Sequence, residues 1–120
     1  MKISTLAVVV AALAPLAGPA TADHRKHSFQ FADALFHDCQ SDVPALRGMC
    51  LGYLAAIADS VESQQIAGTA PRRVCDPAAV SLEDYRRVLI SFLQANPHHM
   101  KKPSSEAVAT AFAVSWPCKE

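Results

Sequence analysis

Four cysteines are the side chains whose chemistry would most change what this 120-residue chain can do: Cys39, Cys50, Cys75 and Cys118. Free thiolates could act as nucleophiles or as zinc ligands, whereas paired cysteines would form structural disulfides. The cysteines are separated by 10, 24 and 42 residues, so the sequence has no close Cys-x-x-Cys pair of the kind found in zinc sites. Zinc binding is therefore the less favoured interpretation.

The first 22 residues have the layout of a secretory signal peptide. Lys2 supplies a positive charge, residues 6–16 are mostly apolar, and residues 20–22 (Ala-Thr-Ala) form a small-x-small cleavage pattern. The apolar run is shorter than the roughly 20 residues that span a bilayer. We therefore expect cleavage before Asp23, no lipid anchor, and a single mature domain of residues 23–120 in the periplasm, with no membrane attachment.

An even number of cysteines in a small exported chain predicts two disulfides. Paired cysteines leave no free thiol for nucleophilic catalysis, and the sequence has neither a Gly-x-Ser-x-Gly elbow nor a phosphate-binding loop. We therefore expect no enzyme activity and no cofactor.

Histidines and carboxylates are the other candidates for chemistry. His98 and His99 are adjacent in a predicted loop, where histidines are usually solvated, so a metal site there is a minor alternative. Asp59 and Glu62 lie three residues apart on a predicted helix. We expect them to be solvated, although Asp59 could be partly buried in a hydrogen-bonded structural role.

Apolar residues recurring at spacings of three and four predict the helices that position these side chains. Ser28 is the expected cap of the first helix, Ser41 or Asp42 of the second, and Ser81 of the third, while Asn96-Pro97 ends the third. The sequence shows no convincing strand. The predicted fold is all-α, a compact four-helix domain with two disulfides and a cleavable signal peptide. The approximate helix ranges are 28–39, 42–62, 81–96 and 103–117.

Each predicted helix has an apolar face that should form the core. Gly48 and Gly52 lie four residues apart on the second helix, where they should admit a close neighbouring helix. The predicted core residues, helix by helix, are Phe29, Ala32, Leu35, Phe36 and Cys39; Leu46, Cys50, Tyr53, Leu54, Ile57 and Val61; Leu82, Tyr85, Val88, Leu89, Phe92 and Leu93; and Val108, Ala109, Phe112 and Trp116.

The helix order favours one pairing of the cysteines. An antiparallel hairpin of the third and fourth helices would bring Cys75 near Cys118 and leave Cys39 to pair with Cys50. In the chain-entropy model the short loop contributes roughly 3 kcal/mol and the long loop roughly 4 kcal/mol. A crossed pairing such as Cys39 with Cys75 stays open, because the sequence does not fix which helices are adjacent.

The charge balance limits the classes of partner. Loss of Lys2 with the signal leaves ten of the eleven Lys and Arg side chains, against eleven Asp and Glu. A near-neutral domain gives no electrostatic reason to bind nucleic acid or an anionic membrane. The basic doublets Arg72-Arg73 and Lys101-Lys102 are solvated charge, or rim contacts for an acidic protein surface.

Four segments of the chain form one combined pattern: "CQSD" (39–42), "CLGYLAAIADS" (50–60), "VCDPAAVSLEDYRRVLISFLQANP" (74–97) and "SSEAVATAFAVSWPC" (104–118). Together they closely resemble the Rap/Tai immunity proteins, and the likeness runs from about Ser28 to Cys118. The resemblance implies a small helical periplasmic protein with two disulfides, often dimeric. It also implies a noncatalytic inhibitor, without a cofactor, of a peptidoglycan amidase toxin delivered by type VI secretion.

The contact with such an amidase is expected to come from an exposed loop that enters the enzyme's cleft. The predicted partner-binding residues are His98, His99, Met100, Lys101 and Lys102, and residues 64–73 are the second candidate loop. The alternative function is a general periplasmic helical binding protein or an acid-stress chaperone, not linked to a toxin. Its five histidines could gain charge between about pH 7 and 5.

Overall fold

The computed structural model describes residues 29–119, so the predicted signal peptide and the predicted cap Ser28 lie outside the described part. Within it no strand element forms, and the only β pairings are two isolated bridges, Phe31 with Pro103 and Val74 with Pro117. The all-α class and the four helices are therefore confirmed. The elements are α1 (Ala32–Gln40), α2 (Pro44–Ile66), α3 (Leu82–Ala95), the 3-10 helix η1 (Pro97–Lys101) and α4 (Ser104–Ser115).

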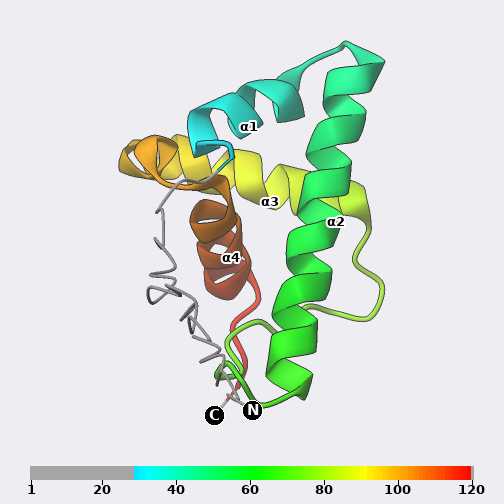
Figure 1. Cartoon of the computed structure of the whole chain (residues 1–120), viewed down its shortest axis with the longest axis vertical. Helices are drawn as coiled ribbons and strands as arrows, with labels where there is room; N and C mark the ends of the chain where they lie inside the picture. The colour runs from blue at the N-terminus through cyan, green and yellow to red at the C-terminus, as the bar shows by residue number, and fades with distance from the viewer. Residues whose placement is uncertain (1–28, 120) are drawn as a thin grey trace, which may run out of the picture.

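The helix α2 is the longest element and sets the shape of the molecule. Figure 1 shows α1 across one end of α2, α3 crossing α2, and α4 beside α2 and below α3 in this view. With 23 residues α2 is about 34 Å long, whereas α4 with 12 residues is about 18 Å long. The segment between α2 and α3 returns beside the C-terminal half of α2. No helix in residues 29–119 is long and apolar enough to cross a bilayer.

The core lies where α1, α3 and α4 meet one face of α2. Tyr85 of α3 packs against Phe112 and Trp116 of α4, with ring centroids 4.7 Å and 5.1 Å away. Phe29 was predicted to lie in this core but is fully exposed, because α1 begins only at Ala32 and helical spacing does not apply before it. The largest fully buried hydrophobic side chains are Phe112, Leu35, Leu54, Leu89, Leu93 and Val108.

Two expectations for α2 are wrong. Its N-cap is Val43, followed by Pro44 in the first turn, rather than Ser41 or Asp42. A Cβ added at Gly48 or Gly52 would meet nothing within 4 Å, so no other part of residues 29–119 approaches these glycines closely. The helix also continues to Ile66, beyond the predicted end near residue 62, because residues 62–67 contain neither glycine nor proline.

The start of α3 agrees with the sequence prediction. The Ser81 hydroxyl accepts a hydrogen bond from the Asp84 N–H at 3.2 Å, and the Asp84 carboxylate accepts one from the Ser81 N–H at 2.9 Å. This reciprocal capping box satisfies two helix-end donors. The hydrogen bond from the Ser81 side chain is the main cause that lowers the pKa of Asp84 to about 2.

Both disulfides join the cysteines that the helix order favoured. Cys39 pairs with Cys50 across the α1–α2 turn, and Cys75 pairs with Cys118 at the far end of the molecule. The crossed alternative is thereby excluded. Cys39 and Cys50 are completely buried in the core, whereas Cys75 is exposed.

Candidate partner-binding site

The predicted contact loop forms a short helical turn between α3 and α4. Asn96 ends α3 by donating from its side-chain amide to the Phe92 carbonyl at 2.9 Å. Pro97 then opens η1, since a proline lacks only a donor that the first turn does not need. Residues 97–101, part of the predicted polar loop, therefore form a short 3-10 helix.

The five predicted contact residues divide into two groups. His98, Lys101 and Lys102 are exposed and can meet a partner. His99 and Met100 are half-buried: the His99 ring lies 4.9 Å from the Phe92 ring, and Met100 packs against the core. The structure thus brings all five together on one turn, with two of them anchoring it and three facing outward.

Backbone hydrogen bonds fix this turn to the start of α1. The Ala32 N–H donates to the Lys102 carbonyl, and the Ser104 N–H donates to the Gln30 carbonyl, both at 3.0 Å. On the surface the Lys102 ammonium lies 3.4 Å from a carboxylate oxygen of Glu106, a pair worth little to stability. The basic turn is held in place before any partner arrives, which reduces the entropy lost on binding.

The second candidate loop, residues 64–73, is also ordered, and one glutamine holds it. The Gln65 side-chain oxygen accepts hydrogen bonds from the Arg73 and Val74 N–H groups at 2.9 Å each, and its amide nitrogen donates to the Val74 carbonyl at 3.0 Å. Gly68 ends α2 with a φ of 69°, a left-handed conformation that favours glycine. Nothing in the polar run around Gln65 distinguishes it in the sequence.

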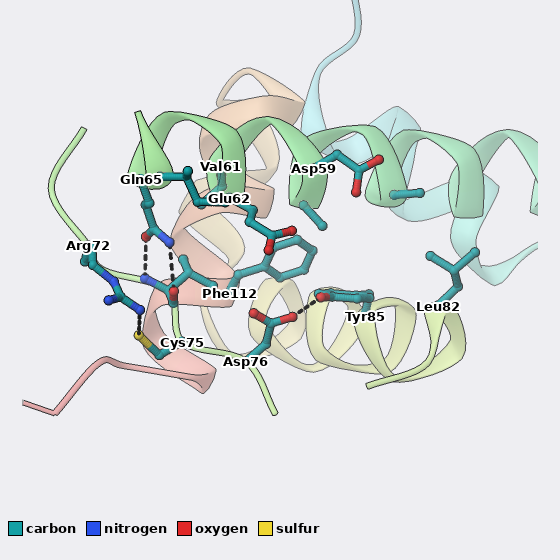
Figure 2. Close-up of a pocket in the computed structure, with 14 residues that line it drawn as sticks. Asp59, Val61, Glu62, Gln65, Arg72, Cys75, Asp76, Leu82, Tyr85 and Phe112 are labelled. Atoms are coloured by element: carbon teal, nitrogen blue, oxygen red, sulfur yellow. Dashed lines mark hydrogen bonds between the residues drawn. The ribbon is translucent and has the colours of Figure 1, made fainter. Parts of the chain in front are cut away.

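A cleft of about 580 Å³ lies against the C-terminal half of α2, and the sequence did not reveal it. Figure 2 shows Asp59 and Glu62 on α2, with Asp76 opposite them. The Asp76 carboxylate accepts a hydrogen bond from the Tyr85 hydroxyl. Burial raises the pKa of Tyr85 above its ordinary value, and the bond to Asp76 raises it further. Asp59 is exposed, as the solvated interpretation expected, and the alternative of partial burial does not hold.

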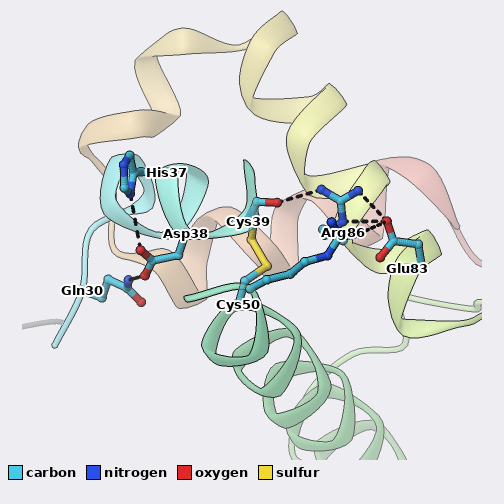
Figure 3. Close-up of a disulfide and its surroundings, with 8 residues drawn as sticks. Gln30, His37, Asp38, Cys39, Cys50, Glu83 and Arg86 are labelled. Carbon is cyan, nitrogen blue, oxygen red and sulfur yellow. Dashed lines mark hydrogen bonds and ion pairs between the residues drawn. A yellow bond between two sulfur atoms is a disulfide. The ribbon is translucent and has the colours of Figure 1, made fainter. Parts of the chain in front are cut away.

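The residues around the Cys39–Cys50 disulfide connect helices to one another through hydrogen bonds and ion pairs (Figure 3). Arg86 of α3 donates to the Cys39 carbonyl at 2.7 Å and also pairs with Glu83, which in turn pairs with Arg47 of α2 at 3.1 Å. The hydrogen bond from Arg86 is the main cause that lowers the pKa of Glu83. One arginine therefore links the end of α1 to α3 directly beside the disulfide.

Residues 29–119 contain no set of three His, Cys, Asp or Glu side chains placed to share a metal ion. All four cysteines are in disulfides, so no thiol is free. Two surfaces of the described residues expose charged side chains close together: the basic η1 turn, with His98, Lys101 and Lys102, and the cleft, which we call the acidic cleft, with Asp59, Glu62 and Asp76. Both are suited to binding another molecule.

A comparison with protein-family models matches residues 31–118 to the Rap1a immunity proteins. Comparisons with curated proteins and with solved structures found no match. The matched segment includes α1, α2, α3 and α4 and all four cysteines.

Proposed function

This chain belongs to the Rap1a immunity protein family, and on that premise we propose that it binds and inhibits a peptidoglycan amidase toxin delivered by type VI secretion. The proposal makes it a noncatalytic protein inhibitor without a cofactor. The toxin attacks the cell wall, so the inhibitor must act in the periplasm, after removal of residues 1–22.

The observation that carries the proposal is the extent of the family match. It covers residues 31–118, which is almost all of the folded domain rather than one shared helix pair. The two disulfides support the periplasmic location, because such bonds persist in oxidising compartments.

We assign the contact with the amidase to the basic η1 turn. Three features support this choice: the turn exposes His98, Lys101 and Lys102, it projects between two helices, and hydrogen bonds at both of its ends fix its shape. A projecting and preordered turn suits insertion into an enzyme cleft, because little conformational entropy is lost on binding.

The experiment is a titration of the mature protein, purified from the periplasm, into a peptidoglycan hydrolysis assay with each amidase toxin of the bacterium that carries this gene. We expect stoichiometric inhibition. Lys101→Glu/Lys102→Glu should weaken inhibition at least tenfold, whereas Arg73→Glu/Lys119→Glu, with the same change in charge, should have a small effect. The opposite ranking would move the contact to the surface around Arg73 and Lys119. Absence of inhibition by the unaltered protein would refute the proposed function.

A homodimer belongs to the same proposal, as the family resemblance implies. The outer face of α2 supports it, because Met49 is exposed there and Gly48 and Gly52 leave the backbone open to close approach. Light scattering of the mature protein would decide, and we expect Met49→Glu to shift a dimer toward monomer.

A further inference from the structure

The acidic cleft lies far from the basic η1 turn. Leu82, the first residue of α3, lines the cleft, whereas η1 follows the last residue of the same helix. The 14 residues of α3 span about 21 Å. The two surfaces are therefore separate, and a ligand of the cleft would not touch the turn.

The cleft has apolar walls. Val61 of α2 and Val74 of the following segment contribute to its lining, the Tyr85 ring borders it from α3, and the fully buried Phe112 ring lies behind it (Figure 2). Ile66 and Leu82 are exposed where they line it. Such walls favour an occupant that brings apolar surface with it.

The polar part of the lining is predominantly negative. Asp59, Glu62 and Asp76 contribute three carboxylates, against the single guanidinium of Arg72. Within residues 29–119, Asp59 and Glu62 form neither a hydrogen bond nor an ion pair. Arg72 contacts Cys75 Sγ at 3.9 Å and lies at the other end of the cleft from Asp59 in Figure 2. The cleft therefore has more negative than positive charge, and the carboxylates of Asp59 and Glu62 have no ion-pair partner in residues 29–119.

The same three carboxylates act on the Tyr85 hydroxyl. After burial, the causes that raise the Tyr85 pKa are the hydrogen bond to Asp76 and the negative charges of Asp76, Glu62 and Asp59. Carboxylates on α2 and in the segment after it therefore all lie close enough to act on the Tyr85 side chain of α3.

These properties select among possible ligands. A bare metal ion is disfavoured, because these side chains do not form a group that could coordinate one. A neutral apolar side chain would desolvate the carboxylates without pairing them. A long side chain with an apolar stem and a cationic head satisfies both the walls and the carboxylates. Arginine fits best, since its planar guanidinium can donate to more than one carboxylate at once.

We propose that this cleft receives an arginine side chain of the amidase that the chain binds. The inference rests on the proposed function for the identity of the partner, and it adds a second contact surface of opposite charge to the η1 turn. The arginine stem would lie against Val61 and the Tyr85 ring, and its head would pair with Asp59 and Glu62. A buried arginine of this kind is a common source of binding energy in protein interfaces.

The first test needs no amidase. NMR spectra of the mature protein are recorded during titration with n-butylguanidinium, and separately with n-pentanol as an uncharged probe of similar length. We expect saturable shifts of the amide signals of cleft residues with the guanidinium only. Asp59→Asn/Glu62→Gln should weaken this binding at least tenfold, which is about 1.4 kcal/mol. The control Asp33→Asn/Asp42→Asn removes the same charge elsewhere and should bind as the unaltered protein does. Equal binding of both probes, or no loss in the cleft variant, would overturn the inference.

The second test measures inhibition of the amidase by the same two variants. A loss of at least tenfold for Asp59→Asn/Glu62→Gln, with no loss for the control, supports the inference. Equal inhibition by both variants overturns it, even if the guanidinium probe binds, and leaves the proposed function standing. If the unaltered protein does not inhibit, the proposed function fails, and the inference that depends on that partner falls with it.

Discussion

The two disulfides should respond differently to a reducing agent under native conditions. A thiolate must reach a sulfur atom to exchange with it. Cys75 is exposed, whereas Cys39 and Cys50 are completely buried behind the end of α1. We therefore expect mild reductant to open the Cys75–Cys118 bond in the folded protein, and to open the Cys39–Cys50 bond only after unfolding.

The stabilisation from each bond can be worked from its loop and its burial. The sequence separations are 11 and 43 residues, so loop closure favours Cys75–Cys118 by (3/2)RT ln(43/11), about 1.2 kcal/mol. Replacing Cys39 and Cys50 by alanine also removes two buried sulfur atoms. Counted as buried methylenes, they contribute about 1.6 kcal/mol together. The two effects nearly cancel, so each double alanine variant should lose about 4–5 kcal/mol of unfolding free energy.

The first assay is a time course of reduction, alkylation and mass spectrometry of the native protein. Alkylation of Cys39 and Cys50 as early as Cys75 and Cys118 would refute the argument from burial. The second assay is urea denaturation of Cys39→Ala/Cys50→Ala and Cys75→Ala/Cys118→Ala. If the first variant is the more stable by about 1.2 kcal/mol, loop length alone determines the effect, and the buried sulfurs contribute nothing.

Further predictions concern the core, the α3 cap and the link to α1, all measured by urea denaturation. Phe112→Ala should cost about 3–5 kcal/mol because a fully buried ring leaves a cavity; a loss below 1 kcal/mol would contradict its placement at the centre of the core. Ser81→Ala should cost about 1 kcal/mol through loss of the N-cap, and no change would mean that the capping box does not form in solution. Asp84 has a folded pKa of about 2, lowered from 3.8, so its contribution is complete above the higher value and is lost as the pH falls toward the lower one. The stability difference between the unaltered protein and Asp84→Asn should therefore shrink from pH 5 to pH 2, and a constant difference would argue against the capping role of the carboxylate. Arg86→Met should cost about 1.5–3 kcal/mol, since it removes a charged donor from the Cys39 carbonyl; a neutral result would show that α1 does not depend on this link.

The sequence was sufficient for features that depend on local pattern and chain order. Ser81 with Asp84 formed the expected cap, and Asn96-Pro97 ended α3 where the periodicity stopped. The order of the helices favoured the disulfide pairing, because an α3–α4 hairpin would bring Cys75 near Cys118, but only the structure excluded the crossed alternative. Each of these conclusions needs only neighbouring residues or the direction of two helices.

The wrong predictions concern residues that have helical spacing but either precede the helix or lie on a face where nothing packs. Phe29 has the spacing of the α1 stripe, yet it precedes the helix and is exposed. Gly48 and Gly52 have the spacing of a close helix contact, but none of the described elements lies against them. Spacing specifies which face of a helix a residue occupies, and it does not specify whether anything packs on that face.

The acidic cleft could not be predicted from the sequence, because its lining comes from four separate segments. Asp59 and Glu62 lie on α2, Asp76 follows Cys75, and Tyr85 and Phe112 belong to α3 and α4. They meet because α2 extends beyond its helical neighbours and the following segment returns beside it. No local signal marks that return, which depends on the Gln65 hydrogen bonds and the second disulfide.

The most direct test of the central claim is protection of cells. An amidase toxin from the bacterium that carries this gene is directed to the periplasm of a sensitive strain, together with either the full chain or residues 23–120 behind a single initiating Met. We predict that cells producing the full chain survive, and that cells retaining the shortened protein in the cytoplasm lyse. Lysis of cells that contain the folded, disulfide-bonded protein in the periplasm would contradict the claim that this chain is an immunity protein against that amidase.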